Sequence, residues 1–107
     1  MKYAVEMTPT AERELHRAFK YIHARSPLNA VRWLRKMSKI IESLGNFPTR
    51  CGIAPESDYL GETLSQYSFK SHRIIFYVDE PGRIVRILFV RHGKMRAVGE
   101  PEDDVDP

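Results

Sequence analysis

The 107-residue sequence predicts an α+β fold in the order β-α-α-β-β-β, with a helix hairpin packed on one face of a small, mostly antiparallel sheet. Three observations predict this fold. Apolar residues recur every three or four positions in two consecutive segments of the first half, as in amphipathic helices. The second half has alternating or continuous apolar runs separated by turn residues, as in strands. The break between the helical segments, Ser26-Pro27, is so short that the two helices must lie antiparallel.

The first half is predicted to contain one strand and two helices. Residues 2–7 alternate between apolar and polar, which indicates a strand. The first helix begins after residues 8–10, where either threonine can cap it, and reaches about Arg25. The second helix begins at Ser26-Pro27, with serine as the cap and proline at the first helical position, and ends at Gly45-Asn46.

The second half is predicted to contain a loop and three strands. Residues 47–61 have two prolines, two glycines and no periodicity, so we expect a loop with one short turn of helix. Residues 64–70 form a first strand, and residues 73–78 form a strand that is apolar on both faces and therefore central. A turn over residues 79–82 leads into the returning strand, residues 83–91.

Length and composition predict one compact domain over residues 1–96 and an acidic, flexible tail over residues 97–107. No apolar run is long enough to span a membrane, and no apolar segment near the N-terminus looks like a signal peptide. With one cysteine, Cys51, no intramolecular disulfide can form, so we expect a cytoplasmic protein with no membrane partner.

The charge is distributed unevenly along the chain. Five of the 14 acidic residues lie in the last eight positions, so residues 1–99 hold 17 basic and 9 acidic residues, a balance of +8. Such a body favours a polyanion or an acidic protein segment as its partner.

Most catalytic and cofactor motifs are missing from the sequence. The four histidines do not have a metal-ligand spacing, and there is no glycine-rich phosphate loop or nucleophile elbow. No pair of carboxylates stands out for acid–base work. We therefore expect no metal and no cofactor.

A cluster of cations at one end of the predicted strands is the main candidate site. If residues 73–79 pair with residues 83–91, His72 and Arg73 lie close to Arg91 and His92, so that distant residues converge into one positive patch. Such a patch could hold phosphates and move a proton in RNA cleavage, could grip an acidic partner, or could simply be solvated. Its members are Lys70, His72, Arg73, Arg91, His92, Lys94 and Arg96.

The outer faces of the two helices carry further basic residues. We expect these faces to be solvated, with contact to nucleic acid as the alternative. Trp33 and Tyr21 could anchor a partner, although aromatic residues on helices more often pack against the core.

The ordered set of motifs resembles the RelE/ParE superfamily of bacterial toxins, the toxic halves of type II toxin–antitoxin operons. The resemblance covers residues 3 to about 96, and its most specific parts are Ser71–Asp79 and Val85–Met95. The other parts are Tyr3–Val5, Thr8–Ala11, Tyr21-Ile22, Ser26–Ala30 and Leu44–Pro48.

Within that superfamily the chain is most similar to the ParE branch, whose members poison DNA gyrase without being nucleases. The RelE branch consists of ribosome-dependent mRNA endonucleases, and by that resemblance Arg73 would stabilise charge at phosphorus while His92 or Lys94 would act after the last strand. Only Lys70 represents the lysines of the RelE pattern, and no tyrosine follows Arg96. These departures favour the ParE branch.

The resemblance also implies a partner and a biological effect. We expect an acidic, partly disordered antitoxin that wraps the helix hairpin or the sheet edge in a hetero-oligomer, together with growth inhibition and plasmid stabilisation. Lys70, His72, Arg91 and Arg96 would then bind the target or RNA. The expected target is DNA gyrase, with the ribosome and mRNA as the alternative. A third alternative is a non-toxic module of the same fold that binds nucleic acid or a partner.

Overall fold

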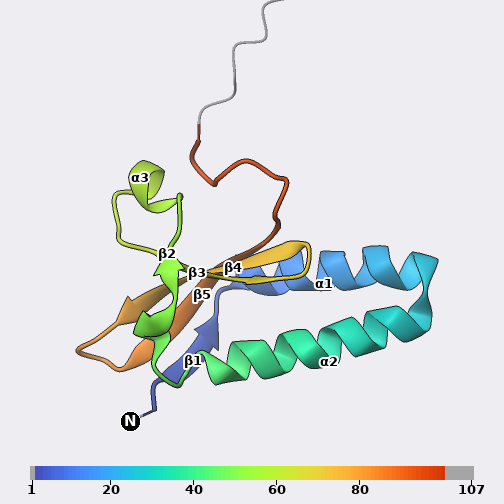
Figure 1. Cartoon of the computed structure of the whole chain (residues 1–107), viewed down its shortest axis with the longest axis horizontal. Helices are drawn as coiled ribbons and strands as arrows, with labels where there is room; N and C mark the ends of the chain where they lie inside the picture. The colour runs from blue at the N-terminus through green and yellow to red at the C-terminus, as the bar shows by residue number, and fades with distance from the viewer. Residues whose placement is uncertain (1, 101–107) are drawn as a thin grey trace, which may run out of the picture.

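The computed structural model describes residues 2–100 and confirms the β-α-α-β-β-β order of the main elements (Figure 1). The region predicted as a loop, residues 47–61, adds three short elements: a 3-10 turn η1, a two-residue strand and one turn of helix. The main elements are β1 (Ala4–Met7), α1 (Pro9–Arg25), α2 (Pro27–Ser43), β3 (Ser65–Phe69), β4 (His72–Asp79) and β5 (Ile84–His92). The short elements are η1 (Pro48–Arg50), β2 (Gly52–Ile53) and α3 (Ser57–Leu60).

The sheet has the strand order β1-β5-β4-β3-β2. The β4 strand is central, as its apolar residues on both faces predict, and every pairing is antiparallel except that of β1 with β5. The β4–β5 register places His72 opposite His92 and Arg73 opposite Arg91, at the end away from the turn. This confirms the predicted pairing.

Side-chain caps hold the helix hairpin together. The Thr8 hydroxyl accepts a hydrogen bond from the Ala11 amide at the start of α1. Ser26 ends α1, because its amide donates to the carbonyl of Ile22, and it caps α2, because its hydroxyl accepts from the amide of Asn29. A single linking residue therefore forces the tight reversal, and the helices run side by side with this turn far from the sheet (Figure 1).

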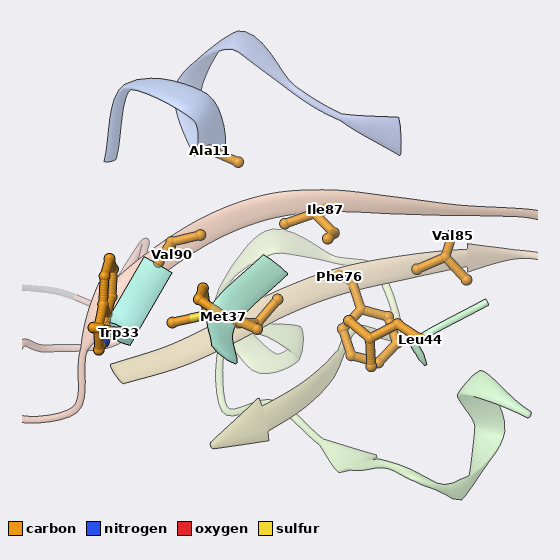
Figure 2. Packing of buried hydrophobic residues seen from close by; sticks show 9 residues of the cluster. Ala11, Trp33, Met37, Leu44, Phe76, Val85, Ile87 and Val90 are labelled. Atoms are coloured by element: carbon orange, nitrogen blue, oxygen red, sulfur yellow. The ribbon is translucent and has the colours of Figure 1, made fainter. Parts of the chain in front are cut away.

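The main core lies between the hairpin and one face of the sheet (Figure 2). Its buried members come from both helices, from the residue that follows α2, and from β4 and β5, because the apolar stripes of the helices face the inward residues of these strands. The core residues are Ala11, Trp33, Met37, Leu44, Ile74, Phe76, Val85, Ile87 and Val90.

A second, smaller cluster lies on the other face of the sheet. Ile75 points away from the helices and packs with Ala54 and Leu64, which belong to the segment around β2 and α3. This segment therefore covers part of the outer face of the sheet. Within residues 2–100, no helix is long and apolar enough to cross a membrane.

Candidate functional site

The predicted cation cluster is divided between the two faces of the sheet. Successive side chains of a strand point to opposite faces, so the His72–His92 pair and the Arg73–Arg91 pair point in opposite directions. His72 contacts Trp33 of α2 on the helix-bearing face, whereas Arg73 contacts the segment that covers the outer face. The expectation of one convergent positive patch is therefore wrong, although the pairing behind it is correct.

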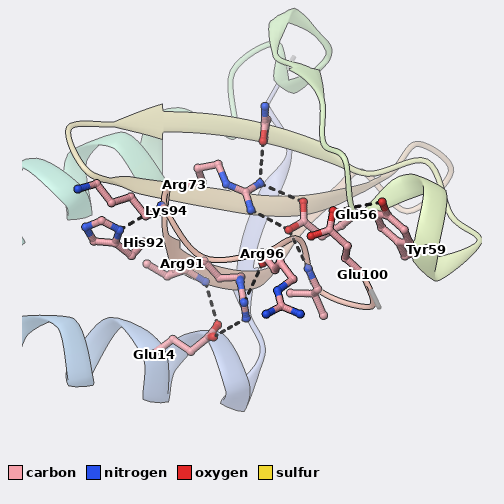
Figure 3. A network of polar contacts seen from close by, with 12 residues as sticks. Glu14, Glu56, Tyr59, Arg73, Arg91, His92, Lys94, Arg96 and Glu100 are labelled. Atoms are coloured by element: carbon pink, nitrogen blue, oxygen red, sulfur yellow. Dashed lines mark hydrogen bonds and ion pairs between the residues drawn. The ribbon is translucent and has the colours of Figure 1, made fainter. Parts of the chain in front are cut away.

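On the outer face, Arg73 is held in a buried network centred on Glu56 (Figure 3). Its guanidinium donates two hydrogen bonds to the Glu56 carboxylate, at 3.0 and 2.8 Å, and a third of 2.9 Å to the Gln66 side-chain oxygen. Glu56 is fully buried and the Arg73 side chain is 12% exposed. In this bidentate geometry, two parallel hydrogen bonds join the arginine and the carboxylate, which is the strong form of such a pair. The Arg73 guanidinium is therefore already engaged within the protein.

The charges of this pair stabilise one another. Burial tends to raise the pKa of Glu56, but hydrogen bonds from Arg73 and from backbone amides, together with the arginine charge, outweigh it, so the pKa of Glu56 is lowered. The hydrogen bond to Glu56 raises the pKa of Arg73. Both groups are therefore charged near neutral pH.

The same network attaches the C-terminal segment to the outer face. The Val98 amide donates to Glu56, the Arg91 guanidinium donates to the carbonyl of Arg96, and the Tyr59 hydroxyl donates to Glu100. Residues 97–100, assigned to the tail by the sequence, thus contact the outer side of the domain. Residues 101–107 lie outside the described residues.

Glu14 of α1 binds the part of β5 that has no neighbouring strand on its β1 side. The β1 strand ends at Met7, opposite Ile87, so the residues of β5 that follow have no β1 partner. Glu14 accepts a hydrogen bond from the amide of Val90 and lies 4.0 Å from the Arg91 guanidinium. Arg91 is therefore held between α1 and the C-terminal segment.

On the helix-bearing face, a groove of about 470 Å³ lies between α1, Trp33 and the ends of β4 and β5. The ring centroids of His72 and His92 are 5.4 Å apart, and those of His72 and Trp33 are 5.3 Å apart. The apolar lining consists of Ala18, Tyr21, Ile22, Trp33, Val90 and Met95. The polar lining consists of Glu14, Arg17, Lys70, Ser71, His72 and His92. We call this region the aromatic groove.

The environment of His72 favours its neutral form. Burial, and then the charge of His92, lower the pKa of His72. Its Nδ1 atom is buried and has no hydrogen-bond partner among residues 2–100. An uncharged ring suits the apolar lining of the aromatic groove.

The other predicted residues lie around these two regions. Lys70 is exposed in the β3–β4 turn and lines the aromatic groove, while Arg96 is exposed in the C-terminal segment. Lys94 is exposed, and its amide donates to His92 Nδ1. No metal-binding group of three or more His, Cys, Asp or Glu side chains occurs in the part of the chain that the structure describes.

Glu56 is the important residue that sequence reasoning missed. It lies in the segment predicted as a loop, where charged residues are normally solvated, and its partner Arg73 is 17 residues away. No spacing or motif links the two residues, so the sequence holds no signal of the pair.

Two of the solved structures that share this fold, which is that of the RelE/ParE toxins, come from toxin–antitoxin systems. One belongs to the chromosomal ParDE toxin–antitoxin system of P. aeruginosa, with a TM-score of 0.68 and 13% identity over 85% of this chain and 96% of that one. The other is the RelBE2 toxin–antitoxin complex of Mycobacterium tuberculosis, with a TM-score of 0.63 and 23% identity over 86% and 92% of the two chains.

The sequence identifies the branch. The family described as the ParE toxin of the type II toxin–antitoxin system, parDE, matches residues 5–97, and the chain belongs to that family. No curated protein matches the chain.

Proposed function

We propose that this member of the ParE family stops growth by binding and poisoning DNA gyrase, and that an acidic antitoxin neutralises it. The observation that carries the proposal is the state of Arg73, the residue that matches the arginine of the RNA-cleaving RelE branch. A catalytic arginine must reach the charge that develops at phosphorus. Here the guanidinium is 12% exposed and makes three hydrogen bonds to Glu56 and Gln66.

The position of His92 also favours a protein target over RNA cleavage. Its strand partner is His72 on the helix-bearing face, so it points away from the face that holds Arg73. A general acid or base must lie within hydrogen-bond reach of the same reacting group that the arginine stabilises. The two predicted catalytic side chains do not share such a location.

The aromatic groove supports the antitoxin half of the proposal. It offers apolar and aromatic contacts from Tyr21, Trp33 and Met95, and it has Arg17 and Lys70 in its lining. A segment with a large apolar side chain flanked by carboxylates fits this chemistry. Both structural neighbours come from toxin–antitoxin systems, which agrees with such a partner.

Two parallel assays on the purified protein test the target. We expect inhibition of gyrase supercoiling with accumulation of cleaved DNA, and no cleavage of ribosome-bound mRNA. Cleavage of that mRNA by the wild type, abolished by His92→Ala, would replace the proposal with the RelE alternative. Arg73→Ala is unsuitable as the deciding variant, because it also leaves Glu56 buried without a partner.

Growth after induced expression separates a toxin from an inactive relative. We expect division to stop, and we expect co-expression of an acidic protein encoded next to this gene to restore it. Normal growth at a confirmed level of soluble protein would instead favour the non-toxic module of the same fold.

A further inference from the structure

The outer faces of the two helices form a second charged surface, separate from the aromatic groove. We propose that this surface binds the phosphate backbone of duplex DNA. Its members are exposed cations that make no ion pair among residues 2–100. We call it the basic ridge, and it comprises Arg13, Lys20, Arg32, Arg35, Lys36 and Lys39.

The α2 part of the ridge is a compact row. At 3.6 residues per turn, its four cations fall within an arc of about 100°, roughly opposite the buried side chains of Trp33 and Met37. From Arg32 to Lys39 the row is about 10 Å long. On α1, Arg13 and Lys20 lie two turns apart, opposite the half-buried Leu15 and Phe19, and they add a second row.

Repulsion between neighbouring cations of the ridge lowers the stability of α2. Arg32 and Lys36, and likewise Arg35 and Lys39, are like charges at i,i+4, a spacing that destabilises a helix. The one acidic residue of α2 is Glu42, in its last turn. A bound polyanion would relieve this repulsion and release its counterions.

The chemistry of the ridge fits nucleic acid better than protein. Protein interfaces have an apolar, aromatic centre, whereas protein–DNA interfaces are polar and strongly positive. The exposed apolar residues of α2, Leu28 and Val31, lie toward the hairpin turn, so cations form the middle of the row. Sites for single strands need aromatic rings on which bases stack, and Trp33 is buried while Tyr21 lines the aromatic groove.

The choice of DNA over duplex RNA rests on the proposed function, because gyrase acts on duplex DNA. The ridge and the aromatic groove occupy different parts of the hairpin surface, since the groove lies on the sheet side and the ridge faces away from the core. DNA and a protein segment could therefore bind at the same time.

Fluorescence anisotropy of the full chain with a labelled 20-base-pair DNA duplex tests the inference. Each phosphate contact adds about −0.9 to the slope of log K against log salt, so we expect a slope between about −3 and −5 from 50 to 200 mM salt. The variant Lys36→Gln/Lys39→Gln should bind at least about tenfold more weakly at 50 mM salt, and its slope should be less negative by about 2.

The matched control also removes two positive charges, but it removes them at and just before β5 instead of from the ridge. Arg83→Gln/Arg86→Gln lies outside the ridge, in the turn before β5 and in β5 itself, and should leave DNA affinity within about twofold of the wild type. Circular dichroism checks that all variants keep their helices. A ridge variant that weakens binding while the control does not would support the inference.

Three results would overturn it: no binding at 50 mM salt, an equal loss in the ridge variant and the control, or tighter binding of duplex RNA or poly-glutamate than of DNA. The last result would assign the ridge to RNA or to an acidic protein. The supercoiling assay reports separately on the proposed function. If the protein binds DNA through the ridge but does not inhibit gyrase supercoiling, gyrase is not its target, and the inferred DNA-binding role of the ridge still holds.

Discussion

At the scale of single residues, the pair of Glu56 and Arg73 makes the sharpest prediction. Removing one partner of a buried ion pair leaves an uncompensated charge, which costs about 3–5 kcal/mol. Because Glu56 is fully buried and also binds the Val98 amide, we expect Arg73→Ala to lower the free energy of unfolding by an amount in that range. Urea unfolding followed by circular dichroism measures the loss.

The exposed ion pair of Arg86 and Glu6 supplies the comparison. Its atoms are 3.6 Å apart and both side chains are well exposed, so Arg86→Ala should cost less than about 1 kcal/mol. Replacing both buried partners, as in Glu56→Leu/Arg73→Met, should recover much of the loss seen in Arg73→Ala. Equal effects of Arg73→Ala and Arg86→Ala would show that the buried network is not important for stability.

The histidine pair makes a prediction about pH. An unfolded His72 takes up a proton near pH 6.5, whereas burial and His92 lower its pKa in the folded chain. Below pH 6.5 the unfolded chain therefore binds more protons at this position, and the free energy of unfolding falls as the pH drops toward the lowered pKa. Above pH 6.5 this contribution to stability is fully present.

Comparison of the wild type with His72→Gln isolates that effect. Unfolding free energies at about pH 7.5 and about pH 5.5 should differ more in the wild type than in the variant. Arg17, Lys70, His92 and Glu14 are the other charged or titratable groups that line the same groove, and among them His92 lowers the pKa of His72. An identical pH dependence in both proteins would contradict the assigned environment of His72.

The sequence could predict part of the site at this scale. The turn at residues 79–82 sets the strand register, so the pairing of Arg73 with Arg91 followed from a local signal. The separation of His72 from Arg73 follows from strand alternation, which the expectation of one patch did not include. Glu56 could not be predicted, because its burial depends on a contact between distant segments.

At the scale of elements, the hairpin turn depends on Ser26. Its hydroxyl caps α2 and its amide closes α1, so one residue satisfies polar groups of both helices. Loss of a serine N-cap typically costs about 1 kcal/mol. We expect Ser26→Ala to reduce the free energy of unfolding by that amount and to lower the melting temperature.

Ser38→Ala serves as the control for that prediction. Ser38 is exposed in the interior of α2, where alanine is the better helix former, so this change should be neutral or slightly stabilising. If the two serine variants unfold alike, the cap contributes nothing measurable.

The elements themselves were predicted well where local chemistry decides them. Both helices end within about two residues of the expected positions, because proline, serine and glycine mark their boundaries. The parallel pairing of β1 with β5 was not predicted, since no turn joins these strands and the chain crosses over through the hairpin. The short elements between residues 48 and 60 likewise depend on packing against the outer face of the sheet.

At the scale of the whole molecule, the fold distributes the basic side chains over two separate surfaces. Arg17 and Lys70 line the aromatic groove, while the basic ridge faces away from the sheet. The balance of +8 over residues 1–99 therefore acts at long range on any acidic partner, but contact requires a particular face. Composition alone could predict the charge, whereas the division into two surfaces needs the hairpin geometry.

Salt dependence of the complex with an acidic antitoxin tests this arrangement. Screening shortens the reach of charges to about 10 Å at 0.1 M salt, so the association rate should fall steeply as salt is raised. Because the proposed antitoxin site is the aromatic groove, Arg17→Gln/Lys70→Gln should slow association and flatten its salt dependence. The ridge variant Lys36→Gln/Lys39→Gln has the same net charge and should change association much less. Surface plasmon resonance measures both rates, and an affinity that stays constant from about 0.05 to 0.5 M salt would show that charge does not guide this partner.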